Sequence, residues 1–217
     1  MIRTAILVDG AFYRKRAHNL MGEKSPADRA KELSQYCNRH IKSSKDNAAL
    51  YRVFYYDCPP ISKNVYNPFL NKSIDLGKSD IYRWTIDFFE ELKHQRKFAL
   101  RLGRLAEEQA HYTIDQKVLN KLLRHDIELS DLTETDFSLQ IAQKGVDMRI
   151  GVDISSLAFK KQVERIILIS GDSDFVPAAK QARREGVDFI LDPMRSPIKP
   201  DLYEHIDGIR TQAPKKT

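Results

Sequence analysis

The hydrophobic pattern of the chain alternates between short apolar runs and longer amphipathic stretches. Residues 3–8, 50–56, 165–170 and 187–191 are nearly continuous apolar runs, as expected of strands that are buried on both faces. Residues 98–105 alternate apolar side chains with small or basic ones, which is typical of an edge strand. We therefore predict five strands.

Helical periodicity fills the stretches between these strands. Ser25 followed by Pro26 is a typical helix start, with serine as the cap and proline in the first turn. Further helical patterns run over 81–92, from about 139 to 163 with a bend near Gly145, over 175–186, and over 201–206. Residues 61–78 have the composition of a loop. Residues 106–137 are interpreted as an insertion that contains a short helix.

Strands that alternate with helices predict an α/β fold, a three-layer sandwich in which helices cover both faces of a parallel sheet. We expect the strand order 3-2-1-4-5, which places strands 1 and 4 side by side at the topological switch point. Ligands of such sheets bind there, outside the carboxyl ends of the strands. One domain is predicted over residues 1–210, including the insertion, followed by a basic tail at 211–217.

The composition narrows the class of protein. With 217 residues and 41% apolar side chains, the chain can bury a full core. It has no apolar run long enough to span a bilayer, and we expect neither a membrane association nor a signal segment. The two cysteines form no CxxC pair and the six histidines are scattered, so we expect no zinc or disulfide framework and a cytoplasmic location. The net charge of +6 favours a polyanionic partner.

Acidic residues collect where the predicted strands end. Asp9 follows the first strand, Asp172 and Asp174 follow the fourth, and Asp147 lies in the segment before the fourth strand. Two carboxylates about 5 Å apart repel by on the order of 3 kcal/mol at an effective dielectric constant of about 20. Such a cluster must take up protons or bind cations, and hard oxygen ligands suit Mg²⁺ or Mn²⁺. This pattern predicts a metal-dependent enzyme that acts on phosphate esters.

Three sequence blocks resemble the NYN domain family, which is part of the PIN-like nuclease superfamily. These blocks are Ile6–Gly10, Gln143–Asp153 and Ser170–Pro177. The segments Phe54–Pro60 and Phe98–Leu105 resemble its bacterial LabA-like branch. Together they cover most of the chain, and residues 106–137 are the part that they match least.

The resemblance implies a five-stranded PIN-like fold and a Mg²⁺- or Mn²⁺-dependent ribonuclease. It implies that Asp9, Asp147, Asp172 and Asp174 are both the catalytic and the metal-binding residues. Water would hydrolyse the phosphodiester bond and leave a 5′-phosphate and a 3′-hydroxyl. The partner would be single-stranded or structured RNA, and a homodimer is compatible with the sequence. Many family members carry an asparagine shortly after the first aspartate, whereas Phe12 and Tyr13 occupy that stretch here.

Each acid also has a structural interpretation. Asp9 could open a turn, Asp174 or Ser173 could cap the following helix, and Asp147 could be an acid that favours a helix start. Asp172 is harder to explain as a cap. Asp153 is predicted to face inward, where it either binds a neighbouring strand or joins the acids.

Other polar residues near the strand ends are harder to assign. Arg14 and Lys15 are the cations best placed to bind substrate, because they follow the first strand directly. Lys144 is either a counter-charge near the scissile phosphate or a solvated lysine. Asp57 and Asp192 both precede turns that contain proline, and we expect both to stabilise these turns. For Asp57, a place in the active site is the less favoured alternative.

Three other functions are compatible with these residues. A catalytically inactive RNA-binding regulator could keep the fold, and Phe12 leaves room for it. A small-molecule phosphohydrolase would need a nucleophilic aspartate in a DxD motif after the first strand, whereas Asp9-Gly10-Ala11 stands here. In the third alternative the acids would only help to hold the domain together.

Overall fold

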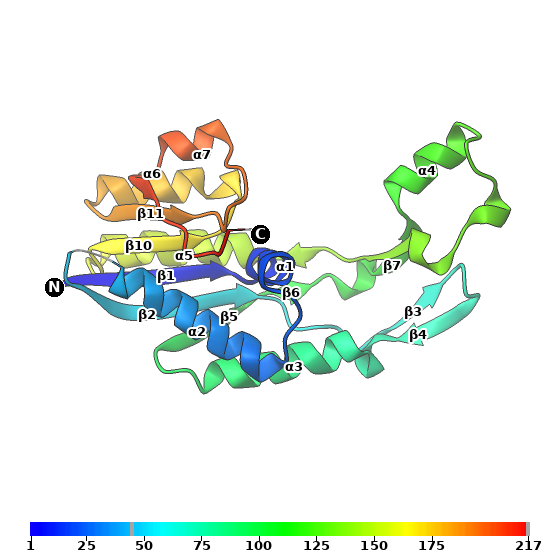
Figure 1. The fold of residues 1–217 in the computed structure, drawn as a ribbon, viewed down its shortest axis with the longest axis horizontal. Helices are drawn as coiled ribbons and strands as arrows, with labels where there is room; N and C mark the ends of the chain where they lie inside the picture. The colour runs from blue at the N-terminus through cyan, green and yellow to red at the C-terminus, as the bar shows by residue number, and fades with distance from the viewer. Residues whose placement is uncertain (44–45, 216–217) are drawn as a thin grey trace.

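A six-stranded parallel sheet is the centre of the fold in the computed structural model, which describes residues 1–43 and 46–215. Within these residues the strand order is β12-β11-β10-β1-β2-β5 (Figure 1). The strands are β1 (Ile2–Asp9), β2 (Ala48–Asp57), β5 (Phe98–Leu102), β10 (Arg165–Ile169), β11 (Asp188–Asp192) and β12 (Gly208–Ile209).

The predicted α/β class, with a parallel sheet between helical layers, is confirmed. The predicted number of strands is wrong, because β12 pairs in parallel with β11 and adds a sixth strand at that edge. The expected five-strand order therefore has to be extended to the six-strand order given above. β1 lies between β2 and β10 in this sheet, and their register brings Asp9 and Ile169 to the same end.

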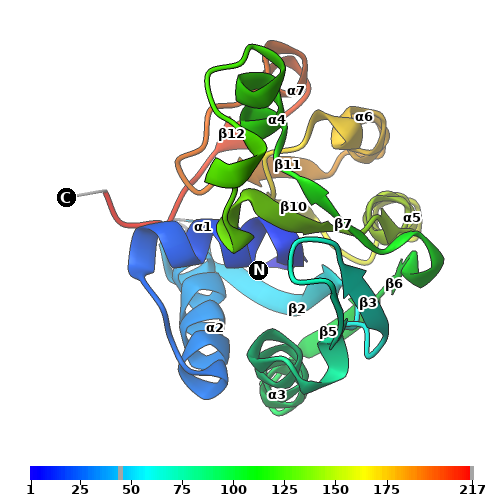
Figure 2. The same ribbon diagram turned by 90° about the vertical axis from the view of Figure 1, so that its right-hand side faces the viewer.

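Helices cover the sheet on both sides (Figure 2). One face packs against α1 (Gly10–Met21), α2 (Pro26–Lys42) and α3 (Asp80–Lys93), and the other against α5 (Val146–Phe159), α6 (Val176–Arg184) and α7 (Pro200–Glu204). Successive side chains of a strand point to opposite faces. Ala5 and Leu7 of β1 accordingly enter one core, and Ile6 and Val8 enter the other. This double burial explains the continuous apolar runs in the sequence.

An extension projects beyond the carboxyl ends of the strands (Figure 1). Its helix and strands are β3 (Asn64–Asn67), β4 (Lys72–Asp75), β6 (Arg104–Leu105), β7 (His111–Ile114), α4 (Gln116–Leu123), β8 (Phe137–Gln140) and β9 (Gln143–Lys144). Short 3-10 turns are η1 (Leu76–Lys78), η2 (Glu107–Gln109), η3 (Leu129–Asp131), η4 (Glu134–Asp136) and η5 (Ser173–Phe175), the last of which lies in the main domain. A small cluster of Ile61, Val65 and Leu76 holds the extension together at its base.

Two predictions in this region are wrong. Residues 61–78 are not a loop, because β3 and β4 form an antiparallel hairpin there. The helix expected from about residue 139 begins only at Val146, and the residues before it form β8 and β9, which pair with β7 and β6. Gly145, with a φ of +81°, makes the turn from β9 into α5. That backbone conformation favours glycine.

The C-terminal segment returns to the main domain. Ala213 is buried in the core under α1 and α2, and the Arg195 Nε donates to its carbonyl oxygen at 2.9 Å. Residues 216 and 217 of the predicted basic tail lie outside the described residues. No helix in the described ranges combines the length and the apolar character needed to cross a bilayer.

A buried polar network joins α2 to the end of β11. Asp192 accepts hydrogen bonds from the Tyr36 hydroxyl, from the His40 Nε2 at 2.8 Å and from the Met194 backbone N–H at 2.8 Å. Asp192, Tyr36 and His40 are all fully buried. Besides the turn role predicted from Pro193, this aspartate therefore satisfies buried donors from a second element.

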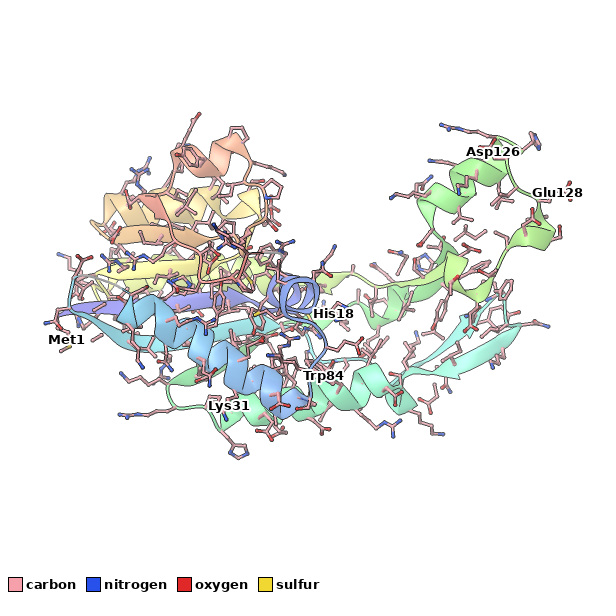
Figure 3. The ribbon with its side chains drawn as sticks, viewed as in Figure 1. Met1, His18, Lys31, Trp84, Asp126 and Glu128 are labelled. Carbon is pink, nitrogen blue, oxygen red and sulfur yellow. The ribbon has the colours of Figure 1, made fainter. Side chains whose placement is uncertain are left out.

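Asp192→Ala should lower the free energy of unfolding by roughly 3–5 kcal/mol, because it leaves buried donors without their acceptor. Urea unfolding followed by circular dichroism measures this loss. The matched control is Asp126→Ala, which removes an exposed aspartate at the tip of the extension (Figure 3). Equal stability of the two variants would contradict a structural role of the network.

Candidate active site

Asp9 links the end of β1 to the start of α1. Its side chain caps the helix, since Oδ1 accepts the Phe12 backbone N–H at 3.1 Å. Its other oxygen, Oδ2, accepts a hydrogen bond from the Ser170 hydroxyl, also at 3.1 Å. Asp9 therefore has a structural role, but as the cap of α1 and not as the start of a turn. The cap also fixes the carboxylate at the sheet rim next to β10.

Ser170 is the residue of this region that the sequence interpretation missed. It is fully buried directly after β10, donates to Asp9, and accepts the Asp172 backbone N–H through its Oγ at 3.3 Å. One hydroxyl thereby connects the end of β1 with the loop after β10. The sequence marks this position only indirectly, because Ser170 opens the Ser-Gly-Asp-Ser-Asp block in which roles were considered for Ser173 and the two acids.

Phe12 lies against the same loop. A Cβ atom placed on Gly171 would be only 2.9 Å from the Phe12 ring, so a larger residue there would have to displace that ring. Phe12 therefore supports the loop between Ser170 and Asp172 by packing.

Asp172 and Asp174 lie in the loop that follows β10, and both are exposed. The Asp172 side chain accepts the Asp174 backbone N–H at 3.1 Å and so caps the 3-10 turn η5 that leads into α6. The alternative in which Asp174 or Ser173 caps the following helix is wrong, because Phe175 is the N-cap residue of α6 and no side chain caps that helix. Asp172 caps only the 3-10 turn before it. The correction leaves Asp174 without that structural explanation.

Asp147 is an exposed acid in the first turn of α5. Partial burial, followed by repulsion from Asp172 and Asp174, raises the pKa of its carboxyl above the ordinary value. Burial raises the pKa of Asp9 to about 6, with smaller contributions from Asp147 and Asp57, although the hydrogen bonds from Phe12 and Ser170 oppose the shift. The carboxylates of β1, α5 and the loop after β10 thus lie in one another's fields.

The basic residues near this rim form salt bridges with acids other than these four. Arg14 pairs with Asp57, Arg101 with Asp153, and Lys144 with Glu108. Across residues 1–43 and 46–215, no lysine, arginine or histidine forms a salt bridge with Asp9, Asp147, Asp172 or Asp174. A lysine does lie beside the loop after β10, since the Lys199 Nζ donates to the Ser173 hydroxyl at 3.1 Å, but it forms no salt bridge with these four acids.

Asp57 is fully buried at the end of β2, beside the start of α1. It accepts the Cys58 backbone N–H at 2.8 Å, the Tyr55 hydroxyl at 3.0 Å and the Arg14 guanidinium at 3.0 Å. Burial raises the pKa of its carboxyl, although Arg14 and the hydrogen bonds act in the opposite direction. A Cβ on Gly10 would lie 2.6 Å from Asp57 Oδ2 and 2.5 Å from a backbone oxygen, which explains the glycine after Asp9.

The three cations assigned to substrate binding have different surroundings. Arg14 is partly buried and held by Asp57. Lys15 is exposed on α1. Lys144 lies in β9, and its Nζ donates weakly, at 3.4 Å, to Glu108 of the extension. Of these residues, only Arg14 has a position fixed by a buried partner.

Asp153 follows the first of its two predicted alternatives. Its Oδ2 accepts the Tyr56 hydroxyl at 2.8 Å and the Arg101 Nε at 3.2 Å, both from strands of the sheet. These bonds hold α5 against β2 and β5. Asp153 thus binds neighbouring strands.

The carboxylate oxygens of Asp9, Asp147, Asp172 and Asp174 are ligands of the kind that a hard divalent cation prefers. Their spacing is looser than that of a complete metal site, since no three acidic, histidine or cysteine side chains among the described residues are grouped so that they could hold one ion. Mg²⁺ keeps several of its waters and is often bound through one or two carboxylates together with substrate phosphates. The side chains fit that mode of binding and do not form an all-protein cage.

Comparison with known proteins places the chain in a family. The model of the NYN domain matches residues 79–198, a range that contains Asp147, Asp172 and Asp174 and begins after Asp9. A crystal structure of a protein of unknown function from Vibrio parahaemolyticus is similar with a TM-score of 0.48 and 14% identity, over 96% of this chain and 91% of that one. A search of curated proteins finds no match. The NYN match spans more than half of the 217 residues, and the chain therefore belongs to the NYN domain family, whose members are generally ribonucleases.

Proposed function

We propose that this protein is a Mg²⁺- or Mn²⁺-dependent ribonuclease that hydrolyses RNA phosphodiester bonds at the rim formed by Asp9, Asp147, Asp172 and Asp174. The observation that carries the proposal is electrostatic. Burial is the largest cause of the raised pKa of Asp147 and of Asp9, and repulsion adds to it: Asp172 and Asp174 raise the pKa of Asp147 further, and Asp147 raises the pKa of Asp9 further. Repulsion between these carboxylates is a cost to the protein, and a bound cation would relieve it.

The four acids have distinct parts in the proposed reaction. Asp9 is held in place by Ser170 and by its capping bond, so it offers a fixed carboxylate. Asp172 is oriented by its bond to the Asp174 backbone, while Asp147 approaches from α5. When bound at these carboxylates, Mg²⁺ or Mn²⁺ supplies positive charge that neutralises the phosphodiester and activates a water.

The proposed substrate is RNA, bound outside residues 106–137. Residues 106–137 of the extension contain eight acidic and three basic residues, whereas the whole chain carries a net charge of +6. The excess of basic over acidic residues therefore lies outside residues 106–137. This positive charge would attract a polyanion to the rest of the chain. Arg14, Lys15 and Lys144 are the proposed substrate contacts at the rim. The proposed compartment is the cytoplasm, in keeping with two buried free cysteines, Cys37 and Cys58.

The wild-type protein should cleave single-stranded RNA only with Mg²⁺ or Mn²⁺, and EDTA should stop the reaction. Asp172→Asn should lower the cleavage rate by at least about 100-fold, since several kcal/mol of charge stabilisation is lost with the ion. The measurement is the rate of product formation from a 5′-labelled oligonucleotide on a denaturing gel.

Asp126→Asn is the matched control for this experiment, because it makes the same chemical change at an exposed acid on the tip of the extension. It should cleave RNA like the wild type. Binding of RNA without cleavage by the wild type in either metal would instead favour the inactive RNA-binding regulator.

Asp172→Asn and Asp147→Asn should melt at the same temperature as the wild type or higher when metal is absent, because each change relieves repulsion. Addition of Mn²⁺ should stabilise the wild type, by about 2.7 kcal/mol at a concentration 100 times the dissociation constant, and should stabilise the variants less. Differential scanning calorimetry with and without Mn²⁺ measures both effects. If the metal-free variants lose several kcal/mol, the acids are structural.

Lys15→Ala should weaken RNA binding without changing the free energy of unfolding, because Lys15 is exposed. Arg14→Ala should also destabilise the fold, by about 3 kcal/mol, since it leaves the buried Asp57 carboxyl without its cation. Asp57→Asn in the Arg14→Ala background should restore part of that loss. Fluorescence anisotropy at low and high salt gives the affinity, and urea unfolding gives the stability. A stable Arg14→Ala variant would contradict the assigned pairing.

A further inference from the structure

A cavity of about 420 Å³ lies where the extension joins the main domain. Its walls come from α1, α3 and the loop after β2 on one side, and from β4, β7 and β8 of the extension on the other (Figure 1). None of the four acids at the sheet rim lines it. The cavity is therefore separate from the candidate active site, and its volume is in the range of pockets that hold small organic molecules.

Most of the residues that line this cavity are apolar or aromatic. Leu76 and Leu139 are among the apolar ones, and the half-buried Tyr82 and Tyr112 add aromatic surface from α3 and β7. Flat rings pack well against such walls, and tyrosine offers a polar group at the end of an apolar ring. Residues from several elements surround the space, which suits one small ring system and does not form the open trough that a helix or a strand would need.

Arg14 is the only charged residue that lines the cavity within the described part of the chain. One end of its guanidinium donates to the fully buried Asp57 at 3.0 Å. The Nε atom of the same group is shielded from solvent and has no hydrogen-bond partner among the described residues. A buried donor without an acceptor costs free energy, and a ligand that places an oxygen atom on this Nε would remove that cost.

The pairing with Asp57 also determines which ligand charge fits the cavity. Because this carboxylate already balances the Arg14 guanidinium, the cavity has no net positive charge to hold an anion. An anionic ligand would lose its hydration in apolar surroundings and would approach Asp57, whereas an uncharged amide or ketone oxygen avoids both penalties. The remaining polar residues of the wall, such as Gln143, are uncharged as well.

We propose that this cavity binds a small uncharged molecule with a flat aromatic ring and an amide or ketone oxygen, and that this oxygen accepts a hydrogen bond from the Arg14 Nε. The proposal is independent of the ribonuclease function, since it uses neither the rim acids nor a metal ion. The bound molecule would contact the main domain and the extension at once. It would thereby stabilise the folded protein more strongly as its concentration rises.

A neighbouring cavity of about 430 Å³ also borders Arg14, and the experiment has to separate the two. Of these two cavities, Gln143 lines only the first and His18 only the second, and both residues are exposed. Gln143→Trp and His18→Trp therefore add the same ring to one cavity each, at surface positions that should accept a larger side chain. Arg14→Lys keeps a cation beside Asp57 but has no donor at the Nε position.

Benzamide is the probe, because it is a flat, uncharged ring with an amide oxygen. Added to the isotope-labelled full chain, it should bind with a dissociation constant of about 1 mM or tighter. It should also move the Arg14 Nε–Hε signal in the NMR spectrum, which is assigned by its absence in Arg14→Lys. Gln143→Trp and Arg14→Lys should each weaken binding by about tenfold, and His18→Trp should bind like the wild type. Benzamidine, which has the same shape but a positive charge and no oxygen, should bind about tenfold more weakly than benzamide.

Other results would contradict the proposal in defined ways. If benzamide does not bind, or binds without moving the Arg14 signal, Arg14 does not recognise the ligand. Tighter binding of benzoate than of benzamide would overturn the uncharged ligand class. Loss of binding in His18→Trp, with binding retained in Gln143→Trp, would place the ligand in the neighbouring cavity. An oligonucleotide that binds in EDTA and loses affinity in Gln143→Trp, with no binding of benzamide, would assign the cavity to a base of RNA instead.

Discussion

The hydrogen bond from the Ser170 hydroxyl to Asp9 is the contact on which the geometry of the rim depends. β1 and β10 are neighbours in the sheet, and both are buried on their two faces. Polar groups can therefore gather only where these strands end. Because Ser170 also accepts the Asp172 backbone N–H, one buried hydroxyl sets the position of two acids that are 163 residues apart in the sequence. Hydrophobic burial brings the acids together, and this bond orients them.

The sheet and its helical layers could be predicted from the sequence because their signals are strong and local. Residues 3–8 and 165–170 are apolar throughout, and the Ser25-Pro26 start of α2 is capped as expected, with the serine side chain accepting the Asp28 N–H at 3.1 Å. The two-residue strand β12 could not be predicted, since Gly208 and Ile209 have no periodicity of their own. It forms only because the edge of β11 offers unpaired backbone groups.

The extension was misinterpreted for a related reason. β3 contains Asn64 and Asn67, which have low strand propensity, and a strand made of such residues depends on its hairpin partner for its conformation. Residues 137–144 have spacings that also fit a helix, and the strand pairings with β7 and β6 decide the outcome. At the candidate site, Asp9, Asp172 and Asp174 could be proposed from their positions after predicted strands, and Asp147 mainly from the family resemblance. The role of Ser170 could not, because it depends on a neighbour at the other end of the chain.

A helix cap and a metal ligand are compatible roles for one carboxylate, which matters for both Asp9 and Asp172. An ionised carboxylate has about four acceptor positions, and each observed hydrogen bond occupies one. Asp9 uses one position for Phe12 and one for Ser170, and Asp172 uses one for the Asp174 N–H. These bonds fix the direction of the remaining lone pairs before any ion arrives. Preorganisation by capping would lower the entropic cost of binding the proposed cation, and the same bonds keep Asp9 ionised more readily than its burial alone would allow.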